Sequence, residues 1–470
     1  MFVGRKKELK LLSDAYHSGK GELVVLYGRR RIGKSSLVDE FAKDKKNYFK
    51  FEAIEGENSR GQIDFFTEIL QKQVNDPILE SVAFKNWGKV FSYLTENIVN
   101  KKSGKKKTLL FFDELQWMAA GRSRLVSLLK YYWDNHWKKK NVMLILCGSV
   151  ASFMVKKVVR SKALYGRITL EILLRGLNPG EAAVLFKGRR SKEEILKYLL
   201  VFGGVPKYLE VIDSGRSFNN NINRMCFAPH GVMTGEVERI FYSQFREVQT
   251  YKKIVYLLKE GIFSFNEISR RLNIASGGGL KLYLENLEHA EIIRSFIPFD
   301  KGFKSKLRKY ALSDEYLYFY FKYIEPNLHI IKDESAAEKL FETLTEKSLD
   351  TWLGFAFERY CLKHAGLLAR VMGFAGYVLL ACPFFGRGDE KFQVDLLYKR
   401  SDKVITVCEI KYRGSKIGKE VIPGIERKIA LLDIPRGYTV EKALISLYGP
   451  DDGLGDSGYF DYDVVLDDIL

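Results

Sequence analysis

Residues 22–38 run ELVVLYGRRRIGKSSLV, and this stretch decides the fold class of the N-terminal part of the chain. The apolar run 22–27 predicts a buried strand, and 34–43 predicts a helix that follows it. Between them, 28–35 match the pattern GxxxxGK[ST]. Glycines let successive backbone N–H groups turn inward around phosphate oxygens, and the start of the helix adds its positive dipole end. The stretch therefore predicts a phosphate-binding loop; the alternative is a chance match in a basic, glycine-containing loop.

Two further apolar runs, 108–112 (TLLFF) and 142–147 (VMLILC), repeat the pattern of the first strand. Unbroken apolar strands that alternate with helices are typical of a parallel sheet with helices on both faces. The fold class expected here is therefore α/β, with the parallel sheet of a P-loop NTPase.

Polar residues follow these strands. Asp113 suits a carboxylate that orients Mg²⁺, and Glu114 beside it can polarise the attacking water. Lys34 is expected to reach the terminal phosphates, and the Ser35 hydroxyl to bind magnesium. Ser149, after the third run, is a candidate sensor of the terminal phosphate. The alternative is that Asp113, Glu114 and Ser149 only cap the helices that follow them.

Several short motifs carry a resemblance to a known family. They are FVGR at 2–5 with Glu8-Leu9, GRRRIGKS at 28–35, LLFFDELQ at 109–116, ILCGS at 145–149, LYGR at 164–167 and GGVPKY at 203–208. In these motifs the chain resembles the archaeal-type P-loop ATPase family, a branch of the AAA+/STAND ATPases. The resemblance implies that Phe2 to Arg5 help to form the adenine pocket, and that Pro206, in a helical lid, approaches the base. It also implies that a winged helix and a C-terminal domain of unknown function follow.

ATP and Mg²⁺ are the expected ligands of this site. Arg167, in the LYGR motif, is a candidate phosphate contact, either to its own nucleotide or to that of a neighbouring subunit. The residues expected around the nucleotide are Phe2, Val3, Arg5, Gly28, Arg29, Arg30, Arg31, Ile32, Gly33, Lys34, Ser35, Ser36, Ser149, Arg167 and Pro206.

The middle of the chain, 251–312, carries three helical patterns and then two short strand patterns. Ser276 is expected to cap the third helix. This order is typical of a winged helix-turn-helix, which favours contact with DNA. The alternative is a structural module that relays the state of the ATPase. Basic residues gather in and beside the turn between the two strands, where phosphates can be met: Lys301, Lys304, Lys306, Arg308 and Lys309.

Two strand patterns near the C-terminus, 392–398 and 404–411, are joined by a turn. A hairpin would place Asp395 near Glu409, and the two-residue period of a strand puts Glu409 and Lys411 on one face. Two carboxylates and a lysine in this arrangement can hold a divalent metal, activate water and stabilise a pentacovalent phosphate.

This D-x(n)-E-x-K arrangement resembles the PD-(D/E)xK nuclease superfamily, although Val394 stands where the superfamily name has proline. Glu358, on the preceding helical pattern 354–360, is expected to add a further oxygen ligand to the metal. The alternative is an ordinary amphipathic hairpin with an exposed Glu-Lys pair.

A chain of 470 residues is too long for a single core, and its formal net charge of +18 favours polyanionic partners, nucleic acid before others. A solvated, lysine-rich surface is the alternative explanation of the charge. We expect four domains: a P-loop ATPase core at 1–177, a helical lid at 178–245, a winged helix-turn-helix at 246–325, and an α/β restriction-endonuclease-like domain at 326–470.

Other features argue against several classes of protein. Five scattered cysteines without a CxxC pair argue against a disulfide scaffold and favour a reducing compartment, and the six histidines form no zinc motif. The charged N-terminus predicts no signal peptide. The longest apolar stretch, 371–385, is shorter than the roughly 20 residues of a membrane span. We therefore expect a cytoplasmic protein without a membrane partner.

These patterns lead to one favoured function and two alternatives. The favoured function is an ATPase that acts on DNA through the winged helix and the C-terminal domain, with ATP binding positioning a metal-dependent nuclease. One alternative is a STAND-type switch whose inactive nuclease-like domain makes protein contacts, and the other is an RNA nuclease. Assembly into a homo-oligomer is left open.

Overall fold

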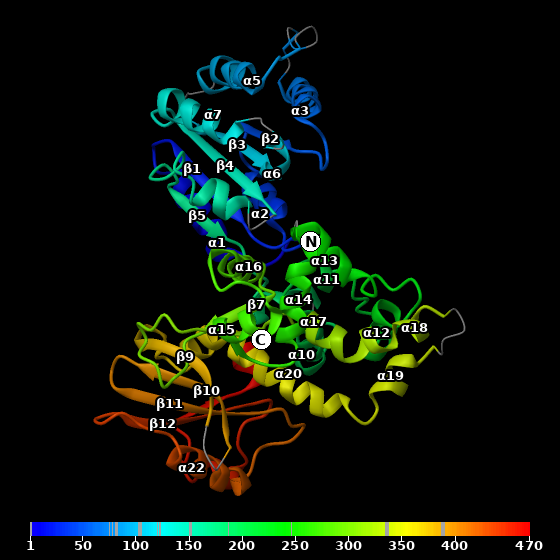
Figure 1. Ribbon diagram of the computed structural model, residues 1–470, viewed down its shortest axis with the longest axis vertical. Coiled ribbons are helices and arrows are strands. Elements are labelled where there is room, and N and C mark those ends of the chain that lie inside the picture. Colours follow the sequence, from blue (N-terminus) through cyan, green and yellow to red (C-terminus); the bar gives the residue numbers. More distant parts are fainter. Residues whose placement is uncertain are drawn as a thin grey trace. The chain divides into compact units, whose positions relative to one another are not determined.

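The computed structural model divides into two compact units, Met1–Gly176 with Tyr242–Arg246, and Leu177–Phe241 with Glu247–Leu470 (Figure 1). We call them the N-terminal unit and the C-terminal unit. The structure describes residues 2–470 apart from 75, 78, 80–82, 102–105, 120, 122–123, 150–152, 187, 246, 334–337 and 387–390. Most of the basic loop predicted at 101–107 lies outside the described residues. The division into four domains stays a prediction.

The N-terminal unit is built on a parallel sheet of five strands in the order β2-β3-β4-β1-β5, which confirms the α/β class with a parallel sheet. Because all five strands run the same way, their carboxyl ends meet at one edge of the sheet. The strands are β1 (Glu22–Tyr27), β2 (Tyr48–Glu52), β3 (Thr108–Asp113), β4 (Val142–Gly148) and β5 (Leu170–Leu173).

Helical segments connect these strands. The α-helices are α1 (Lys6–Tyr16), α2 (Lys34–Ala42), α3 (Ser59–Gln73), α5 (Trp87–Tyr93), α6 (Leu115–Met118) and α7 (Leu125–Tyr132). Three π-helical segments span Leu94–Val99, Trp133–Trp137 and Met154–Val159.

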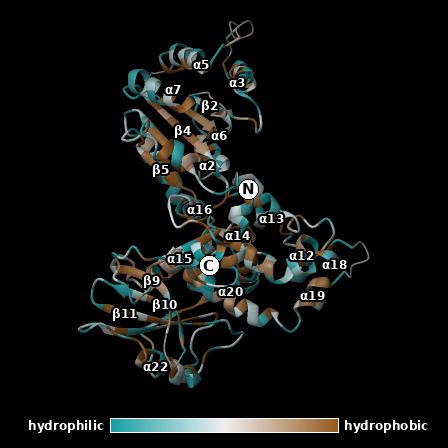
Figure 2. Ribbon diagram, in the orientation of Figure 1, coloured by the Kyte–Doolittle hydropathy of each residue, from teal (hydrophilic) through white to brown (hydrophobic). Residues whose placement is uncertain are grey.

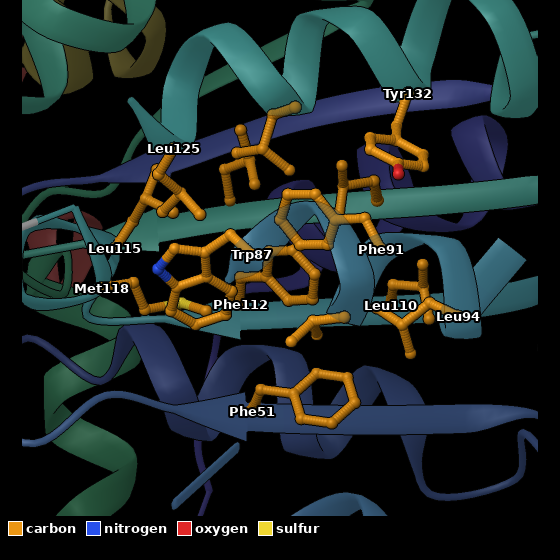
Figure 3. Close-up of a cluster of buried hydrophobic side chains, with 14 of the residues drawn as sticks. Phe51, Trp87, Phe91, Leu94, Leu110, Phe112, Leu115, Met118, Leu125 and Tyr132 are labelled. Atoms are coloured by element: carbon orange, nitrogen blue, oxygen red, sulfur yellow. The ribbon is translucent and has the colours of Figure 1, made fainter. Parts of the chain in front are cut away.

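Both faces of this sheet are buried, as strand β3 illustrates. Leu110 and Phe112 point into one core, whereas Leu109 and Phe111 point into another, and all four side chains are inaccessible to solvent. The first core is aromatic, and Phe66 of α3 and Phe91 of α5 pack against Phe112. Figure 3 shows Phe112 in this core with Phe91 and Trp87. The strands are accordingly mostly hydrophobic along their length (Figure 2). Burial on both faces explains why they are apolar runs without alternation.

The first part of the C-terminal unit is helical, with α9 (Pro179–Ala183), α10 (Lys192–Phe202), α11 (Pro206–Leu209), α12 (Phe218–Cys226) and the start of α13 (Glu236–Gln244). Gly203 and Gly204 separate α10 from α11. A Cβ at Gly204 would lie 2.1 Å from the Leu177 carbonyl oxygen, so only glycine fits there. The Gly204 carbonyl oxygen in turn accepts a hydrogen bond from the Leu177 amide at 2.7 Å.

The middle of the C-terminal unit contains three helices and a small antiparallel sheet of order β6-β8-β7. Ser264 caps α15 in a capping box with Glu267, whose carboxylate accepts from the Ser264 amide. The expected cap at Ser276 is wrong: α16 has Gly277 at its N-cap and no side-chain cap, because the run of glycines moves the first turn beyond the serine. The elements are α14 (Val248–Leu258), β6 (Phe263–Ser264), α15 (Phe265–Leu272), α16 (Gly278–His289), β7 (Ile293–Phe296) and β8 (Lys309–Leu312).

A second five-stranded sheet, of order β13-β12-β11-β10-β9, forms the last part of the chain. Strands β9, β10 and β11 are antiparallel, and β11, β12 and β13 are parallel. Its strands are β9 (Val378–Phe385), β10 (Gln393–Arg400), β11 (Val404–Lys411), β12 (Thr439–Ser446) and β13 (Tyr462–Val464). The helices are α17 (Glu315–Phe319), α18 (Leu328–Ile331), α19 (Leu340–Thr345), α20 (Leu349–Lys363), α21 (Ala365–Val371), α22 (Ile422–Ala430), α23 (Asp452–Gly455) and α24 (Leu466–Ile469).

Two expectations about the chain as a whole are met. The apolar stretch 371–385 ends in strand β9, and no helix among the described residues has the length and apolarity to cross a bilayer. All five cysteines are buried and free, so the chain has no disulfide scaffold.

Candidate functional site

The GxxxxGK[ST] loop connects β1 to α2, as its flanking patterns predict. Gly28 and Gly33 have positive φ angles, 150° and 84°. A Cβ at Gly28 would lie 2.3 Å from the Leu174 carbonyl oxygen, so a residue with a side chain does not fit at this position of the loop. A Cβ at Gly33 would meet nothing within 4 Å, so the loop faces open space at the start of α2. This is the geometry in which backbone amides can receive phosphate oxygens.

Lys34 lies at the start of α2 and is buried. Its Nζ atom donates hydrogen bonds to the carbonyl oxygens of Arg29, at 2.9 Å, and Gly28, at 3.2 Å. Burial lowers the pKa of Lys34, and the nearby carboxylates of Glu114 and Asp113 oppose that shift. The ammonium group thus lies over the loop, and phosphate oxygens are acceptors that can replace the two carbonyls.

Ser35 and Asp113 come together at the edge of the sheet where the strands end. The Ser35 hydroxyl donates to Asp113 Oδ2 at 2.5 Å, and Asp113 Oδ1 accepts from the Glu114 amide at 2.9 Å. One hydroxyl and one carboxylate, side by side next to a phosphate-binding loop, are oxygen donors of the kind that Mg²⁺ prefers. This donor set therefore fits a magnesium ion.

Glu114, Ser149 and Gln116 are linked by hydrogen bonds. The Ser149 hydroxyl donates to Glu114 Oε2 at 2.7 Å, and the Gln116 amide nitrogen donates to the Ser149 hydroxyl at 3.2 Å and to Glu114 Oε2. Gln116 Oε1 is buried and accepts no hydrogen bond within the described part of the chain. Gln116 lies in the LLFFDELQ motif, but no role was expected for it; its two-residue spacing from Glu114 was the available signal.

The N-terminal segment lies against the phosphate-binding loop. Arg5 is buried, and its Nη2 donates to the Ile32 carbonyl oxygen at 3.0 Å. Phe2 packs on the hydrophobic core that contains Ile32, while Val3 is partly exposed. The segment 2–5 and the loop 28–35 thus form one connected structure in the N-terminal unit.

The loop arginines have different surroundings. Arg29 is buried, whereas Arg30 pairs with Glu55 at 3.0 Å on the surface. Arg31 has a φ of 71°, which is uncommon for a residue with a side chain. Ser36 is in the first turn of α2.

Arg167 has another partner in the N-terminal unit, and Pro206 belongs to the C-terminal unit. Arg167 makes a two-pronged ion pair with Asp134, at 2.8 Å and 2.9 Å, and also donates to the Tyr165 carbonyl oxygen. Pro206 is the first residue of α11, in the C-terminal unit. Their expected roles at the nucleotide stay predictions.

In the C-terminal unit, β10 and β11 form the expected antiparallel hairpin, with Leu396 opposite Cys408. Continued by one residue, this register sets Asp395 opposite Glu409. Asp395 carries a raised pKa because of burial and of the neighbouring Glu409 charge, and a hydrogen bond from the Ile410 amide opposes the shift. The predicted pair of carboxylates is therefore adjacent in space.

Glu409 is almost fully buried and is held by two lysines. Lys411 Nζ lies 2.7 Å from Glu409 Oε1, and Lys428 Nζ lies 2.7 Å from Glu409 Oε2. Lys428 comes from α22, and nothing in its local sequence pattern singles it out. Over the residues that the structure describes, no three His, Cys, Asp or Glu side chains are grouped closely enough to hold a metal. The predicted metal ligands are thus not assembled into a complete set among the described residues, and two lysines pair with Glu409.

Glu358, on α20, is in the electrostatic neighbourhood of this pair. Burial raises its pKa to about 7, and the negative charge of Asp395 adds to the shift, while Lys411 and Arg359 oppose it. Glu358 is therefore electrostatically coupled to Asp395, Glu409 and Lys411, and its expected role as a metal ligand stays a prediction.

The raised pKa of Glu358 predicts a pH-dependent effect of Glu358→Gln. A carboxyl whose pKa is raised on folding stabilises the protein while protonated, and this stability is lost as pH rises through the folded pKa of about 7. Glutamine resembles the protonated form at every pH. Urea unfolding in EDTA should give equal free energies of unfolding near pH 4.5 and a more stable variant above pH 7. The exposed control Glu346→Gln should differ little from wild type across this range, and a Glu358→Gln difference that does not change with pH would contradict the assignment.

Comparison with known proteins bears on the N-terminal site. Residues 2–212 match the family model described as an ATPase domain predominantly from Archaea. An uncharacterized protein of Methanocaldococcus jannaschii is 28% identical over 419 residues, 88% of this chain and 88% of that protein. An uncharacterized ATP-binding protein of the same organism is 48% identical over 46 residues, 10% of this chain and 78% of that protein.

Among solved structures, the Walker-type ATPase of Pyrococcus abyssi is similar at 20% sequence identity and a TM-score of 0.49, over 68% of this chain and 95% of that one. The family match spans the loop 28–35, Asp113, Glu114 and Ser149, which the structure brings to one edge of the sheet. Through its residues 2–212, the chain belongs to the family of ATPase domains found predominantly in Archaea.

Proposed function

We propose that the chain binds Mg-ATP at the loop 28–35 and hydrolyses it. The observation that carries the proposal is the hydrogen bond between Ser35 and Asp113, with Lys34 buried over the same loop. Ser35 and Asp113 would hold Mg²⁺, which would neutralise charge on the phosphates. Lys34 would bind the terminal phosphates as a compact positive charge.

Glu114 is proposed to orient the attacking water. Its carboxylate is held by Ser149 and Gln116, which fixes the direction of the side chain. The free acceptor on Gln116 can receive a hydrogen bond from the same water. Ser149 would report the presence of the terminal phosphate, because its hydroxyl is already bonded to Glu114. The name of one relative, an ATP-binding protein, also supports a nucleotide as ligand.

The substitution Glu114→Gln tests this proposal. It keeps the size of the side chain but removes the base, so ATP binding should persist while hydrolysis falls by about 10²–10³-fold. Binding is measured by titration and hydrolysis by phosphate release. The control Glu40→Gln removes a carboxylate that pairs with Lys43 on the surface of α2, and it should leave both unchanged. Hydrolysis at the wild-type rate in Glu114→Gln would contradict the proposal that Glu114 orients the attacking water.

We further propose that the chain acts on DNA, with phosphodiester cleavage at the cluster of Glu358, Asp395, Glu409 and Lys411. The support is the hairpin that sets Asp395 beside Glu409, with Lys411 at 2.7 Å from it. A divalent metal bound there by the carboxylates would supply an activated water. The order of helices and strands from α14 to β8 is that of a winged helix, and the net charge of +18 favours a polyanion.

The alternative function is a nucleotide-dependent switch whose C-terminal sheet makes protein contacts. The observation that favours it is Lys428, which already occupies one oxygen of Glu409. DNA binding separates the two functions, because contacts with phosphates release counterions and weaken steeply as salt rises. A DNA-acting protein should show that dependence, whereas a switch should show little DNA binding and a change of oligomer size with nucleotide.

A further inference from the structure

A cavity of about 140 Å³ lies beside the acidic cluster of the C-terminal unit. Among the residues that line it are Arg294 from β7, Arg359 and Glu358 from α20, and Asp395 from β10. Its volume is well below the roughly 300–1,000 Å³ of pockets that enclose a whole small molecule. The cavity therefore suits one small group rather than a nucleoside.

Two arginines in this cavity lack an acceptor. Within the ranges that the structure describes, neither the Arg294 nor the Arg359 guanidinium has a hydrogen-bond or ion-pair partner. Both are largely buried, and burial lowers the pKa of Arg294 to about 10. Arg359 stacks on the Tyr318 ring, with its central carbon 4.1 Å from the ring centroid, which leaves its N–H edges available. An arginine stays charged at neutral pH, so two positive charges face the same small space.

The neighbouring carboxylates attract the two arginines but form no ion pair with them among the described residues. Glu315 also lines the cavity; Lys363 pairs with its Oε2 at 2.8 Å, and its Oε1 is buried without a hydrogen-bond partner in the described part of the chain. Glu358 and Asp395 make no ion pair with either arginine among the described residues, and they are the acids proposed above to hold a divalent metal. A buried cation without a partner is costly, and an anion that pairs with it recovers that cost.

We propose that Arg294 and Arg359 form a binding site for the terminal phosphate of a DNA strand. Guanidinium groups bind phosphate with paired hydrogen bonds, and a terminal phosphate offers three free oxygens and close to two negative charges. An internal phosphodiester carries a sugar on each side, which a cavity of this size does not admit. That the phosphate belongs to a DNA strand rests on the proposed function. The site would hold a strand end next to the acidic cluster.

The test compares short single-stranded DNA with a 5′-phosphate, a 3′-phosphate or hydroxyls at both ends, by equilibrium binding to the full chain. All solutions contain Ca²⁺ in place of Mg²⁺ and no ATP, so the acidic cluster can keep a divalent cation, and a gel run after each titration checks that the strands are still intact. Wild type should bind one of the phosphorylated strands about tenfold more tightly than the hydroxyl strand. Arg294→Gln and Arg359→Gln should each remove this preference. Inorganic phosphate should compete with the phosphorylated strand and leave binding of the hydroxyl strand unchanged.

Arg308→Gln is the matched control, because Arg308 is an exposed arginine near β8 that donates to the Ser295 hydroxyl. It should weaken binding of all strands alike and keep the preference for a phosphate. Without DNA, Arg294→Gln should melt at the wild-type temperature or higher, because it removes a buried charge that has no partner. A clear fall in its melting temperature would mean that Arg294 supports the fold, and would overturn the proposal.

Three further outcomes would overturn it. The first is equal binding of all strands by wild type, and the second is a preference for phosphorylated strands that survives in both glutamine variants. The third is binding of inorganic phosphate without any preference for phosphorylated strands, which would assign the cavity to a free anion. A wild-type protein that cuts no DNA but still prefers phosphorylated ends would refute the proposed cleavage and leave the phosphate site standing.

Discussion

Lys34→Ala is expected to lower ATP hydrolysis by at least about 10²–10³-fold and to weaken ATP binding at the same time. The Lys34 ammonium is buried over the loop and bonded to two loop carbonyls, so the terminal phosphates would receive its charge at close range in a partly dry site. A charge acts more strongly there than at the surface, because water no longer screens it. Hydrolysis is measured by phosphate release, and binding by titration with ATP in the presence of Mg²⁺.

The control for this variant is Lys43→Ala, at the other end of α2. The Lys43 side chain is largely exposed and pairs with Glu40, so its loss changes the net charge equally but leaves the loop intact. Alanine is a good helix former at both positions, and far-UV circular dichroism should show an unchanged helix content. If Lys34→Ala hydrolyses ATP as fast as Lys43→Ala, the loop 28–35 is not the site of hydrolysis.

Glu409→Gln is expected to abolish metal-dependent DNA cleavage, with a loss of about 10²-fold or more. Glu409 is the most buried carboxylate of its cluster and is bonded to Lys411 and Lys428. A neutral amide can neither hold a divalent metal well nor balance two lysines. Cleavage is measured on single-stranded and duplex DNA with Mg²⁺ or Mn²⁺, with and without ATP.

The matched variant is Glu426→Gln, on α22. Glu426 pairs with Lys442 at 3.1 Å in a more exposed position, so it removes one carboxylate outside the cluster. It should cut DNA like wild type. If the wild-type protein leaves all these DNA forms intact, the alternative function as a nucleotide-dependent switch is favoured. In that case the Lys428 ammonium balances the charge of Glu409 where a nuclease would bind a metal.

The parts of the fold that the sequence predicts are those encoded by neighbouring residues. The strand of residues 22–27 and the loop at 28–35 are continuous in the chain, and their apolar and glycine patterns follow from burial on both sheet faces and from turn geometry. The same holds for β10 and β11, where one turn and a two-residue period place Asp395 beside Glu409. A pattern of this kind does not fix the exact end of a helix. The N-cap of α16 is Gly277 and not the expected Ser276.

Contacts between side chains from distant elements cannot be predicted from a local sequence pattern. Gln116 is close to Glu114 in sequence, yet its role depends on β4 bringing Ser149 within 3.2 Å. Lys428 reaches Glu409 only because α22 packs near the second sheet. The ion pair of Arg167 with Asp134 also has no signal in the sequence, since the two residues are on different segments of the chain.

By itself, the amino-acid sequence determined the phosphate-binding loop, the acidic strand end and the class of the first sheet, because each depends on residues next to one another in the chain. Only the tertiary structure decided that Lys428 meets Glu409 and that Arg294 and Arg359 share a cavity. The reason is physical: burial, unpaired charge and a cavity arise between elements far apart in the chain, and no local pattern encodes the distance between them.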